Sequence, residues 1–355
     1  MVAIGVRHYG GVLLHERDLL QVEDLTMHFP MGGGWFSRPT GWVRAVDGVS
    51  FSLRRGETLG LVGESGCGKS TLARLVVRLL KPTSGAIRFD GREIAALDPR
   101  GMRPLRRRLQ IIFQDPYASL DPRMTVAASI TEPLLNQGRP SMRERRELAA
   151  ELLTTVGMKA DDRDRFPHAF SGGQRQRIGI ARALCARPDL VVADEPVSAL
   201  DVSIQAQILN LMQKLQQRFG MAYLFISHDI AVVEQFCDRI AVMYAGQLVE
   251  IADAAHFNNR CRHPYSRALV ASVPQPDPTI PLPSAPVAGE PPDPSDLPPG
   301  CPYHSRCPHA HDPCPVDRPP LVDVGDSHRL ACWLNGGTGL APHEMIWLLQ
   351  YPASR

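Results

Sequence analysis

Short apolar runs and segments of helical periodicity alternate along most of the chain. Three apolar runs have the length and composition of buried strands, at residues 58–62, 190–193 and 222–226. A further apolar stretch over 240–251 turns near Ala245-Gly246 and predicts a β-hairpin. Strands interleaved with helices indicate an α/β fold.

Apolar residues three and four apart predict helices over 70–80, 141–156 and 203–219. Pro82 stops the first helix, because proline lacks the backbone donor that a helix needs. Ser141 and Glu144 have the spacing of a capping box at the start of the second helix. Gly220 follows the third helix, where glycine commonly ends a helix.

Proline is unevenly distributed and divides the chain. Of 32 prolines in 355 residues, eleven lie within residues 274–300. Proline fixes φ and donates no hydrogen bond, so this stretch can be neither a helix nor a central strand. It predicts a semi-rigid extended linker. The expected parts are a domain over 1–271, a linker over 272–300, a Cys-rich module over 301–335 and a tail over 336–355.

Charge and hydropathy exclude several classes of protein. Lys and Arg number 39 and Asp and Glu 37, a net charge of +2. This balance argues against broad nucleic-acid binding, and no nucleic-acid partner is expected. No stretch reaches the roughly 18–20 uncharged apolar residues of a membrane-spanning helix, and the first residues show no signal-peptide pattern. These features predict a soluble cytosolic protein.

The most specific local motif is a phosphate-binding loop that fits G-x-x-x-x-G-K-[ST]. Its residues are Gly63, Glu64, Ser65, Gly66, Cys67, Gly68, Lys69, Ser70 and Thr71. The loop stands between a predicted strand and a predicted helix, so its backbone N–H groups can surround phosphates at the positive end of the helix. Lys69 is expected to neutralise phosphate charge and the Ser70 hydroxyl to bind Mg²⁺. All nine residues are predicted to bind the nucleotide.

A second apolar run ends in an acidic pair. Residues 190–193 deliver Asp194 and Glu195 to the carboxyl end of a predicted strand. At this position Asp194 can hold Mg²⁺ through water, and Glu195 can act as the general base toward an attacking water. The pair therefore predicts hydrolysis of the bound nucleotide.

The stretch Phe170-Ser-Gly-Gly-Gln-Arg-Gln-Arg177 resembles the signature motif of the ABC ATPases. Ser171, Gly172 and Gly173 present backbone donors and a hydroxyl at the start of a helix, as a phosphate-binding terminus does. In that family, the motif (here Ser171 to Gln174) reaches across a dimer to the γ-phosphate held by the partner's loop. The resemblance thus implies that two nucleotides are enclosed between two such domains.

Other positions match the motifs of that family one by one. Gln114 resembles the glutamine that senses Mg²⁺ and the lytic water, and His228 resembles the histidine that contacts the γ-phosphate. Phe29 and Val43 resemble the residues that pack on adenine. The loop that reports across the dimer is matched by Ser198, Ala199, Leu200 and Asp201.

The resemblance implies a complete catalytic apparatus. The expected catalytic residues are Glu195, His228 and Gln114. The expected Mg²⁺ ligands are Ser70, Gln114 and Asp194. The implied fold is an ABC-type ATPase domain with a mixed sheet core, a helical subdomain and an antiparallel β subdomain.

Two ten-residue stretches, 113–122 and 194–203, and the tripeptide 263–265 resemble the peptide/nickel importer branch of the ABC ATPases, and most closely the second ATPase subunit of dipeptide and oligopeptide importers. The resemblance implies a second ATPase subunit in a heterodimer, two transmembrane permeases and a substrate-binding protein. It implies a peripheral location on the cytoplasmic face of the inner membrane. Nickel chelates, glutathione and D-amino-acid dipeptides are alternative cargoes. A soluble ABC ATPase and a redox regulator are alternative functions.

Four of the eight cysteines are scattered through the domain and are expected to be small buried residues, namely Cys67, Cys185, Cys237 and Cys261. The other four fall close together, at Cys301, Cys307, Cys314 and Cys332. Disulfides are disfavoured in a reducing cytosol, and zinc sites usually contain paired C-x2-4-C spacings that this segment lacks. We expect a [4Fe–4S] cluster, with Zn²⁺ or no metal as the alternatives. The importer branch has a similar Cys-rich tail, which agrees with this interpretation.

Overall fold

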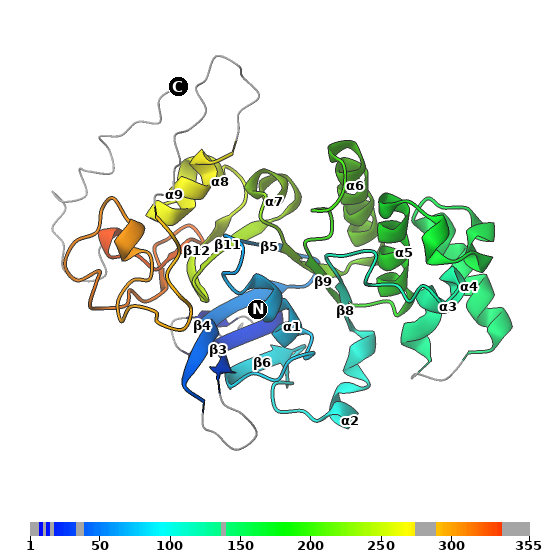
Figure 1. Ribbon diagram of the computed structural model, residues 1–355, viewed down its shortest axis with the longest axis horizontal. Helices are drawn as coiled ribbons and strands as arrows, with labels where there is room; N and C mark the ends of the chain where they lie inside the picture. The colour runs from blue at the N-terminus through cyan, green and yellow to red at the C-terminus, as the bar shows by residue number, and fades with distance from the viewer. Residues whose placement is uncertain are drawn as a thin grey trace, which may run out of the picture.

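The computed structural model describes residues 7–9, 12–14, 18–32, 39–135, 140–273 and 289–335. A mixed sheet runs through the middle of the molecule, and a smaller antiparallel sheet lies below it in the view of Figure 1. Helices pack on the mixed sheet and extend to one side as a separate group. No described helix is long and apolar enough to span a membrane.

Four neighbouring strands of the mixed sheet run parallel, in the order β5 (Thr58–Val62), β10 (Ala222–Ile226), β9 (Leu190–Asp194) and, at the edge of the sheet, β8 (Leu109–Ile112). Strands β5, β9 and β10 are buried along their whole length, as expected for parallel strands covered on both faces. Alternate residues serve two different cores: Val191 and Phe225 pack with one group of helices, and Val192 and Leu224 pack toward the smaller sheet. The three strands predicted from apolar runs are confirmed.

The predicted hairpin is also confirmed. It consists of β11 (Arg239–Tyr244) and β12 (Gln247–Asp253), which pair antiparallel, while β11 pairs parallel with β5. Ala245 and Gly246 both have positive φ angles at the turn. The hairpin converts a parallel sheet into the mixed sheet that the resemblance implied.

The smaller sheet is antiparallel and has the order β4-β3-β6-β7. Its strands are β3 (Asp18–Met31), β4 (Gly41–Arg54), β6 (Ser84–Phe89) and β7 (Arg92–Glu93). A separate short hairpin is formed by β1 (Arg7–Tyr9) and β2 (Val12–Leu14). Helix α1 (Lys69–Val76) contributes Leu72 and Leu75 to the core between the two sheets. The phosphate loop is thus held between both sheets.

Helix α1 is shorter than predicted. The periodicity favours a helix as far as residue 80, but the helix ends at Val76 because Arg78 adopts a left-handed φ of 57°. The Arg78 guanidinium donates hydrogen bonds to the carbonyl oxygens of Leu80, Ile94 and Leu97. These bonds tie the chain reversal to the next segment, and such long-range contacts override local helix propensity.

The helical group lies on the right of Figure 1, beyond β8, and consists of α3 (Val126–Thr131), α4 (Met142–Thr155) and α5 (Gly172–Cys185). Helix α4 begins at the predicted capping box of Ser141 and Glu144. Beside this group is α6 (Val202–Phe219), which ends at Gly220 in the left-handed conformation. The two predicted helices here are therefore confirmed within a residue or two. The described residues also form the α-helices α2 (Pro99–Met102), α7 (Ile230–Phe236), α8 (Phe257–Arg260) and α9 (Pro264–Ala271).

Residues 289–335, named here the C-terminal segment, pack against the preceding domain. Strands β13 (Val322–Asp323) and β14 (Arg329–Leu330) extend the mixed sheet, because β14 pairs with β12. Cys301, Tyr303 and Cys314 pack into the same core as the helices of the domain. A segment this short shares the core of the domain instead of forming its own. The predicted tail over 336–355, and linker residues 274–288, lie outside the described residues.

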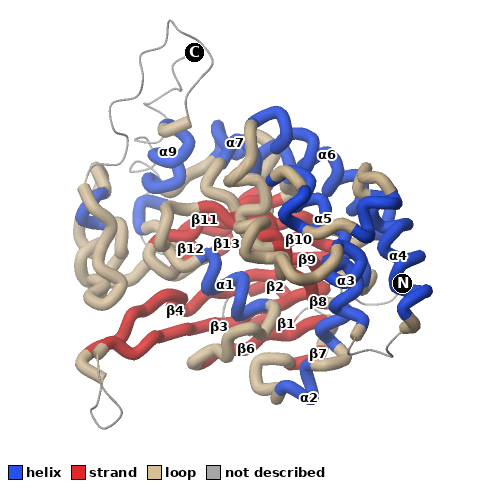
Figure 2. Tube along the Cα trace, turned by 45° about the vertical axis from the view of Figure 1, so that its right-hand side comes forward, coloured by secondary structure: helices blue, strands red, loops and turns tan. Residues whose placement is uncertain are grey.

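The C-terminal segment lies at the opposite end of the mixed sheet from the helical group, as Figures 1 and 2 both show. It packs beside α9 and β12 and comes close to β4. In the described part of the linker, residues 289–300 contain no helix or strand, as predicted from their prolines. The backbone amide of Arg44 in β4 donates to the carbonyl of Pro294 at 2.9 Å, so this part of the linker reaches the smaller sheet.

Candidate nucleotide-binding site

The phosphate loop opens onto a cleft of about 530 Å³. Loop residues 65–71 line it together with four other predicted site residues, Val43, Gln114, Glu195 and His228. The cleft therefore brings together the loop after β5, the segment after β8 and the ends of β9 and β10. Ligands of open α/β sheets commonly bind beyond the carboxyl ends of the strands, where these elements converge.

Two glycines give the loop its shape. Gly63 has a φ of 157°, and a Cβ atom there would stand 2.2 Å from the Met243 carbonyl oxygen. Gly68 has a φ of 107°, and a Cβ atom there would stand 2.1 Å from the Ala45 carbonyl oxygen. Both approaches are far inside van der Waals contact, so only glycine fits these two positions.

Lys69 begins α1 and is buried. Its ammonium group donates to the carbonyl oxygens of Gly63 at 2.7 Å and Glu64 at 2.8 Å. The cation therefore lies within the curve of its own loop, where phosphate oxygens of a nucleotide would meet it. Burying a charge costs free energy unless it is paired, and these carbonyls supply the pairing.

Ser70 and Asp194 are in direct contact: the Ser70 hydroxyl donates to Oδ1 of Asp194 at 3.0 Å. Burial raises the pKa of the Asp194 carboxyl, and the Ser70 hydrogen bond opposes this shift. Mg²⁺ binds oxygen ligands and typically uses one or two protein groups together with the phosphates of its substrate. A hydroxyl and a carboxylate placed beside the phosphate loop fit this ion. Gln114, the third predicted ligand, lines the same cleft.

Glu195 is the meeting point of the predicted catalytic side chains. Gln114 donates from Nε2 to Oε2 of Glu195 at 2.9 Å, and Nδ1 of His228 lies 3.3 Å from the same oxygen. Glu195 itself has a left-handed φ of 47°. A non-glycine residue held in this strained region is a recurrent feature of functional sites. The arrangement can orient a water molecule and accept its proton.

Some predicted site residues lie away from the cleft. Phe29 is paired with Val43 across β3 and β4, but only Val43 lines the cleft. Gly63 and Glu64 shape the loop from behind it. Ser171 caps α5 and forms a capping box with Gln174, and the signature segment lies outside the cleft.

The loop over 198–201, which the resemblance places at the dimer contact, also lies outside the cleft, but it contacts Glu195. The Ser198 hydroxyl donates to the Glu195 carbonyl oxygen at 3.1 Å, while Asp201 caps α6 without a side-chain hydrogen bond to it. A Cβ atom on Gly172 would lie 3.5 Å from the Leu200 side chain. The loop therefore connects Glu195 with the start of α5.

The four C-terminal cysteines converge on one small cavity, which Cys301, Cys307, Cys314 and Cys332 line together. All four thiols are free, and burial raises the pKa of Cys301 to about 11 and that of Cys332 to about 12. Among the described residues, however, no three His, Cys, Asp or Glu side chains are placed to hold one metal ion. The structure thus brings the four expected ligands to one cavity but does not show the expected iron–sulfur or zinc centre itself. The other four cysteines are buried, as expected.

Several contacts to the site were not predicted from the sequence. Arg44, Ala45, Ala245 and Gly246 line the cleft from the smaller sheet and the hairpin turn, and Pro294 lines it from the linker. Arg306 of the C-terminal segment forms an ion pair with Glu64 of the phosphate loop. No periodicity or local motif signals these contacts, because each joins residues far apart in the chain.

A phosphate loop, an acidic pair at the end of the neighbouring strand and a glutamine–glutamate–histidine cluster define a nucleotide-hydrolysing P-loop cassette. Residues 46–198 match the ABC transporter family, and residues 249–314 match the oligopeptide/dipeptide transporter C-terminal region. The chain belongs to the ATP-binding proteins of the ABC transporter family and is an ABC-type ATPase.

Curated relatives are similar over most of the chain. The probable peptide ABC transporter ATP-binding protein y4tS of Sinorhizobium fredii is 52% identical over 88% of this chain and 89% of its own length. The oligopeptide transport ATP-binding protein AppF of Bacillus subtilis is 48% identical, over 90% and 98%. The dipeptide transport ATP-binding protein DppF of Escherichia coli is 47% identical, over 90% and 95%.

Solved structures confirm the ABC fold. The dimeric structure of MJ0796, a bacterial ABC transporter cassette, has a TM-score of 0.60 and 30% identity, covering 67% of this chain and all of that one. A dimeric post-hydrolysis state of the same cassette with ADP and phosphate aligns equally well.

Proposed function

We propose that this protein is the ATPase subunit that powers peptide import through an ABC transporter. The convergence of Gln114 and His228 on one oxygen of Glu195, beside an intact phosphate loop, carries the proposal that it hydrolyses ATP. The match to the oligopeptide/dipeptide transporter C-terminal region, and relatives named for peptide transport, support a peptide as the cargo.

The side chains have distinct proposed roles. Lys69 leaves its carbonyl partners for the phosphates, and the loop amides surround the same oxygens. Ser70 and Asp194 hold Mg²⁺, which supplies charge neutralisation at the phosphates. Glu195 accepts the proton of the attacking water, while Gln114 and His228 keep its carboxylate in place. Val43 and Phe29 are proposed to cover the adenine.

The signature residues act on a second cassette in this proposal. Ser171, Gly172, Gly173 and Gln174 lie outside the cleft of their own chain, which is consistent with a role toward a partner's nucleotide. ATP then joins two cassettes, and hydrolysis lets them separate, a two-state change that ligands can bias. The proposed assembly contains a second ATPase subunit, two permeases and a substrate-binding protein, with this chain peripheral to the inner membrane on its cytoplasmic side.

Reconstitution of the complex in lipid vesicles tests the transport function. We expect uptake of labelled dipeptides and oligopeptides to require ATP on the side of this subunit. Lys69→Ala should abolish ATP binding and uptake together, because the cation at the phosphates is removed. Uptake by the Lys69→Ala complex at the parent rate, or ATP-driven uptake of nickel chelates without any peptide uptake, would overturn the proposal.

We propose separately that the four C-terminal thiols hold a [4Fe–4S] cluster. The support is that four free cysteines line one cavity, a donor set suited to iron–sulfur ligation. Zinc is the weaker choice, because it would need all four sulfurs about 2.3 Å from a single ion. A bound cluster would cross-link the loops of the C-terminal segment, which places only a few side chains in the core of the domain.

Anaerobic purification of the full chain tests the cluster. We expect about four iron and four sulfide per chain, with the visible absorbance of a cluster. Cys332→Ser should lose most of the iron, whereas Cys185→Ser, a buried cysteine far from the cavity in sequence, should retain it. A parent protein without iron, or equal iron in both variants, would contradict the assignment.

A further inference from the structure

Arg306 reaches from the C-terminal segment to the phosphate loop. It lies in a single 3-10 turn, His304–Arg306, directly before Cys307. Its two terminal nitrogens lie 3.0 Å from the two carboxylate oxygens of Glu64, one to each. Such a bidentate pair fixes orientation as well as distance. The arginine side chain is only 5% exposed and the glutamate 25%, so solvent screens this pair much less than a surface pair.

Glu64 is held at three separate points. Arg306 binds the carboxylate, and the Glu64 backbone amide donates to the Tyr265 hydroxyl at 2.8 Å. The Glu64 carbonyl oxygen accepts from the ammonium group of Lys69 at 2.8 Å. The residue that receives Arg306 therefore also sets the position of the cation that is to meet the phosphates.

The charge of Glu64 gives this contact a second consequence. Glu64 directly precedes Ser65, which lines the cleft, and an isolated carboxylate there would repel the phosphates of a nucleotide. Arg306 neutralises it at hydrogen-bond distance. The phosphate loop can therefore carry an acidic residue without losing its attraction for anions.

Aromatic packing holds Arg306 in place. The Arg306 guanidinium donates a hydrogen bond to the Tyr244 hydroxyl at 3.0 Å. The ring centroids of Tyr244, Tyr265 and Tyr303 lie between 4.5 and 5.4 Å apart, which is a favourable spacing for aromatic pairs. Tyr244 ends β11, Tyr265 is on α9, and Tyr303 precedes the turn that contains Arg306. The three rings therefore pack the C-terminal segment against β11 and α9, next to the phosphate loop.

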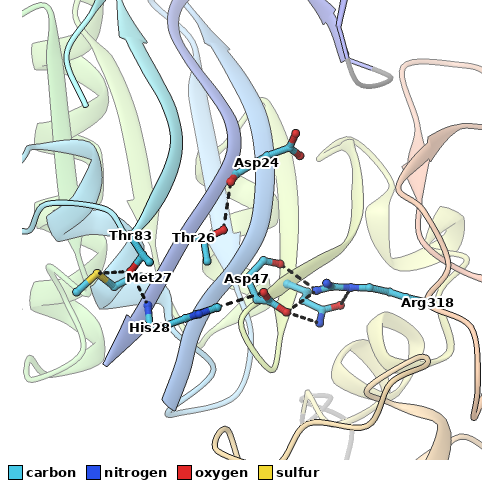
Figure 3. Close-up of polar contacts among 8 residues, drawn as sticks. Asp24, Thr26, Met27, His28, Asp47, Thr83 and Arg318 are labelled. Carbon is cyan, nitrogen blue, oxygen red and sulfur yellow. Dashed lines mark hydrogen bonds and ion pairs between the residues drawn. The ribbon is translucent and has the colours of Figure 1, made fainter. Parts of the chain in front are cut away.

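A second arginine fastens the C-terminal segment elsewhere. Figure 3 shows Arg318 and His28 approaching Asp47 of β4 from opposite sides. Arg318 contacts the Asp47 carboxylate at 3.1 Å and the Gln247 side chain at 2.7 Å. This pair is more exposed than the Arg306 pair, with 40% of the Arg318 side chain accessible. It docks the segment without touching the phosphate loop and so provides a matched comparison.

We propose that Arg306 is a positioning residue for the phosphate loop, so that the C-terminal segment forms part of the ATP site. The inference rests on the proposed nucleotide site. Arg306 fixes Glu64, Glu64 fixes the starting position of Lys69, and the ion pair cancels a negative charge beside the phosphates. The C-terminal segment thereby determines how tightly the cassette binds ATP.

The test of this role is to measure ATP binding to the purified full-length chain by calorimetry with Mg²⁺ present. Arg306→Gln should weaken the affinity for ATP about tenfold, because it leaves the partly buried Glu64 carboxylate without its positive partner. The double variant Glu64→Gln/Arg306→Gln should recover to within about threefold of the parent, since residues in direct contact show coupled effects. Arg318→Gln should lower the melting temperature while changing ATP affinity by less than about twofold.

Several outcomes would overturn the inference. One is a folded Arg306→Gln protein that binds ATP within twofold of the parent, and another is a double variant that binds no better than Arg306→Gln. Equal weakening by Arg318→Gln would show that docking alone matters. If Arg306→Gln does not fold, Arg306→Lys replaces it, because lysine keeps the charge but not the bidentate contact. Arg306→Lys should weaken the affinity for ATP about threefold. An affinity equal to that of the parent would contradict the proposed role of Arg306.

Lys69→Ala separates this inference from the proposed function. Loss of ATP binding in Lys69→Ala together with parent-like binding in Arg306→Gln would reject only the role of Arg306. ATP binding by Lys69→Ala at parent affinity would reject the nucleotide site itself.

Discussion

Glu195→Gln is expected to reduce steady-state ATP hydrolysis at least about a hundredfold, since general-base catalysis typically contributes factors of that size or more. Glutamine keeps the shape of the side chain and can still contact Gln114 and His228, but it cannot accept a proton from water. ATP binding should persist, because Lys69 and the loop amides are untouched. Phosphate release by the reconstituted complex and equilibrium ATP binding give the two measurements.

Glu147→Gln provides the control for this prediction. Glu147 pairs with Arg143 on the surface of α4, with 62% of its side chain exposed, and its replacement should change neither quantity. Hydrolysis by Glu195→Gln at the parent rate would show that Glu195 is not the base. Loss of both binding and hydrolysis would show that Glu195 instead supports the fold of the cleft.

Gly68→Ala is expected to weaken ATP binding about a hundredfold, because a displacement of about 1 Å at a site can cost that much. The added methyl group would stand 2.1 Å from the Ala45 carbonyl oxygen. Strand β4 and the phosphate loop must then move apart, and both form walls of the cleft. ATP titration of the purified variant measures the effect.

Gly66→Ala is the matched control within the same loop. Gly66 also has a left-handed φ, 82°, but a Cβ atom there would meet no heavy atom within 4 Å. Both variants place an alanine at a positive φ, which costs at least about 1–2 kcal/mol in each. Only Gly68→Ala adds the collision with Ala45, so an affinity for ATP no weaker in Gly68→Ala than in Gly66→Ala would show that the collision is unimportant.

Local patterns in the sequence predicted the centre of the mixed sheet and the helices α4 and α6, whereas the smaller antiparallel sheet was implied only by the family resemblance. Apolar runs located β5, β9 and β10, and the capping box located the start of α4, because each signal depends on neighbouring residues alone. The end of α1 was misplaced, since the left-handed turn at Arg78 is stabilised by carbonyls of a later segment. Tertiary contacts of this kind override local propensity.

The candidate site also combines residues that local motifs predicted with contacts that they did not. Motifs predicted Lys69, Ser70, Gln114, Glu195 and His228 as site residues, and all five line one cleft. Each motif fixes its side chain at the end of a strand or the start of a helix, so the topology of the sheet brings the groups together.

Contacts between distant segments could not be predicted. Pro294 and Arg306 stand in a stretch that reads as linker and Cys-rich module, and their partners Arg44 and Glu64 are more than two hundred residues earlier. Nothing in either local pattern specifies its partner. The pairing of β14 with β12 could not be predicted for the same reason, because the two strands meet only in the folded sheet.

The ion pair between Glu64 and Arg306 joins residues 242 positions apart. Protein synthesis proceeds from the N-terminus, and domains begin to fold while later residues are still being added. The phosphate loop thus leaves the ribosome long before its arginine partner exists. A chain interrupted between α9 and residue 306 would contain every local motif of the ATPase and still lack this contact. The order of synthesis therefore allows the contact between Glu64 and the C-terminal segment to form only after residue 306 has been added.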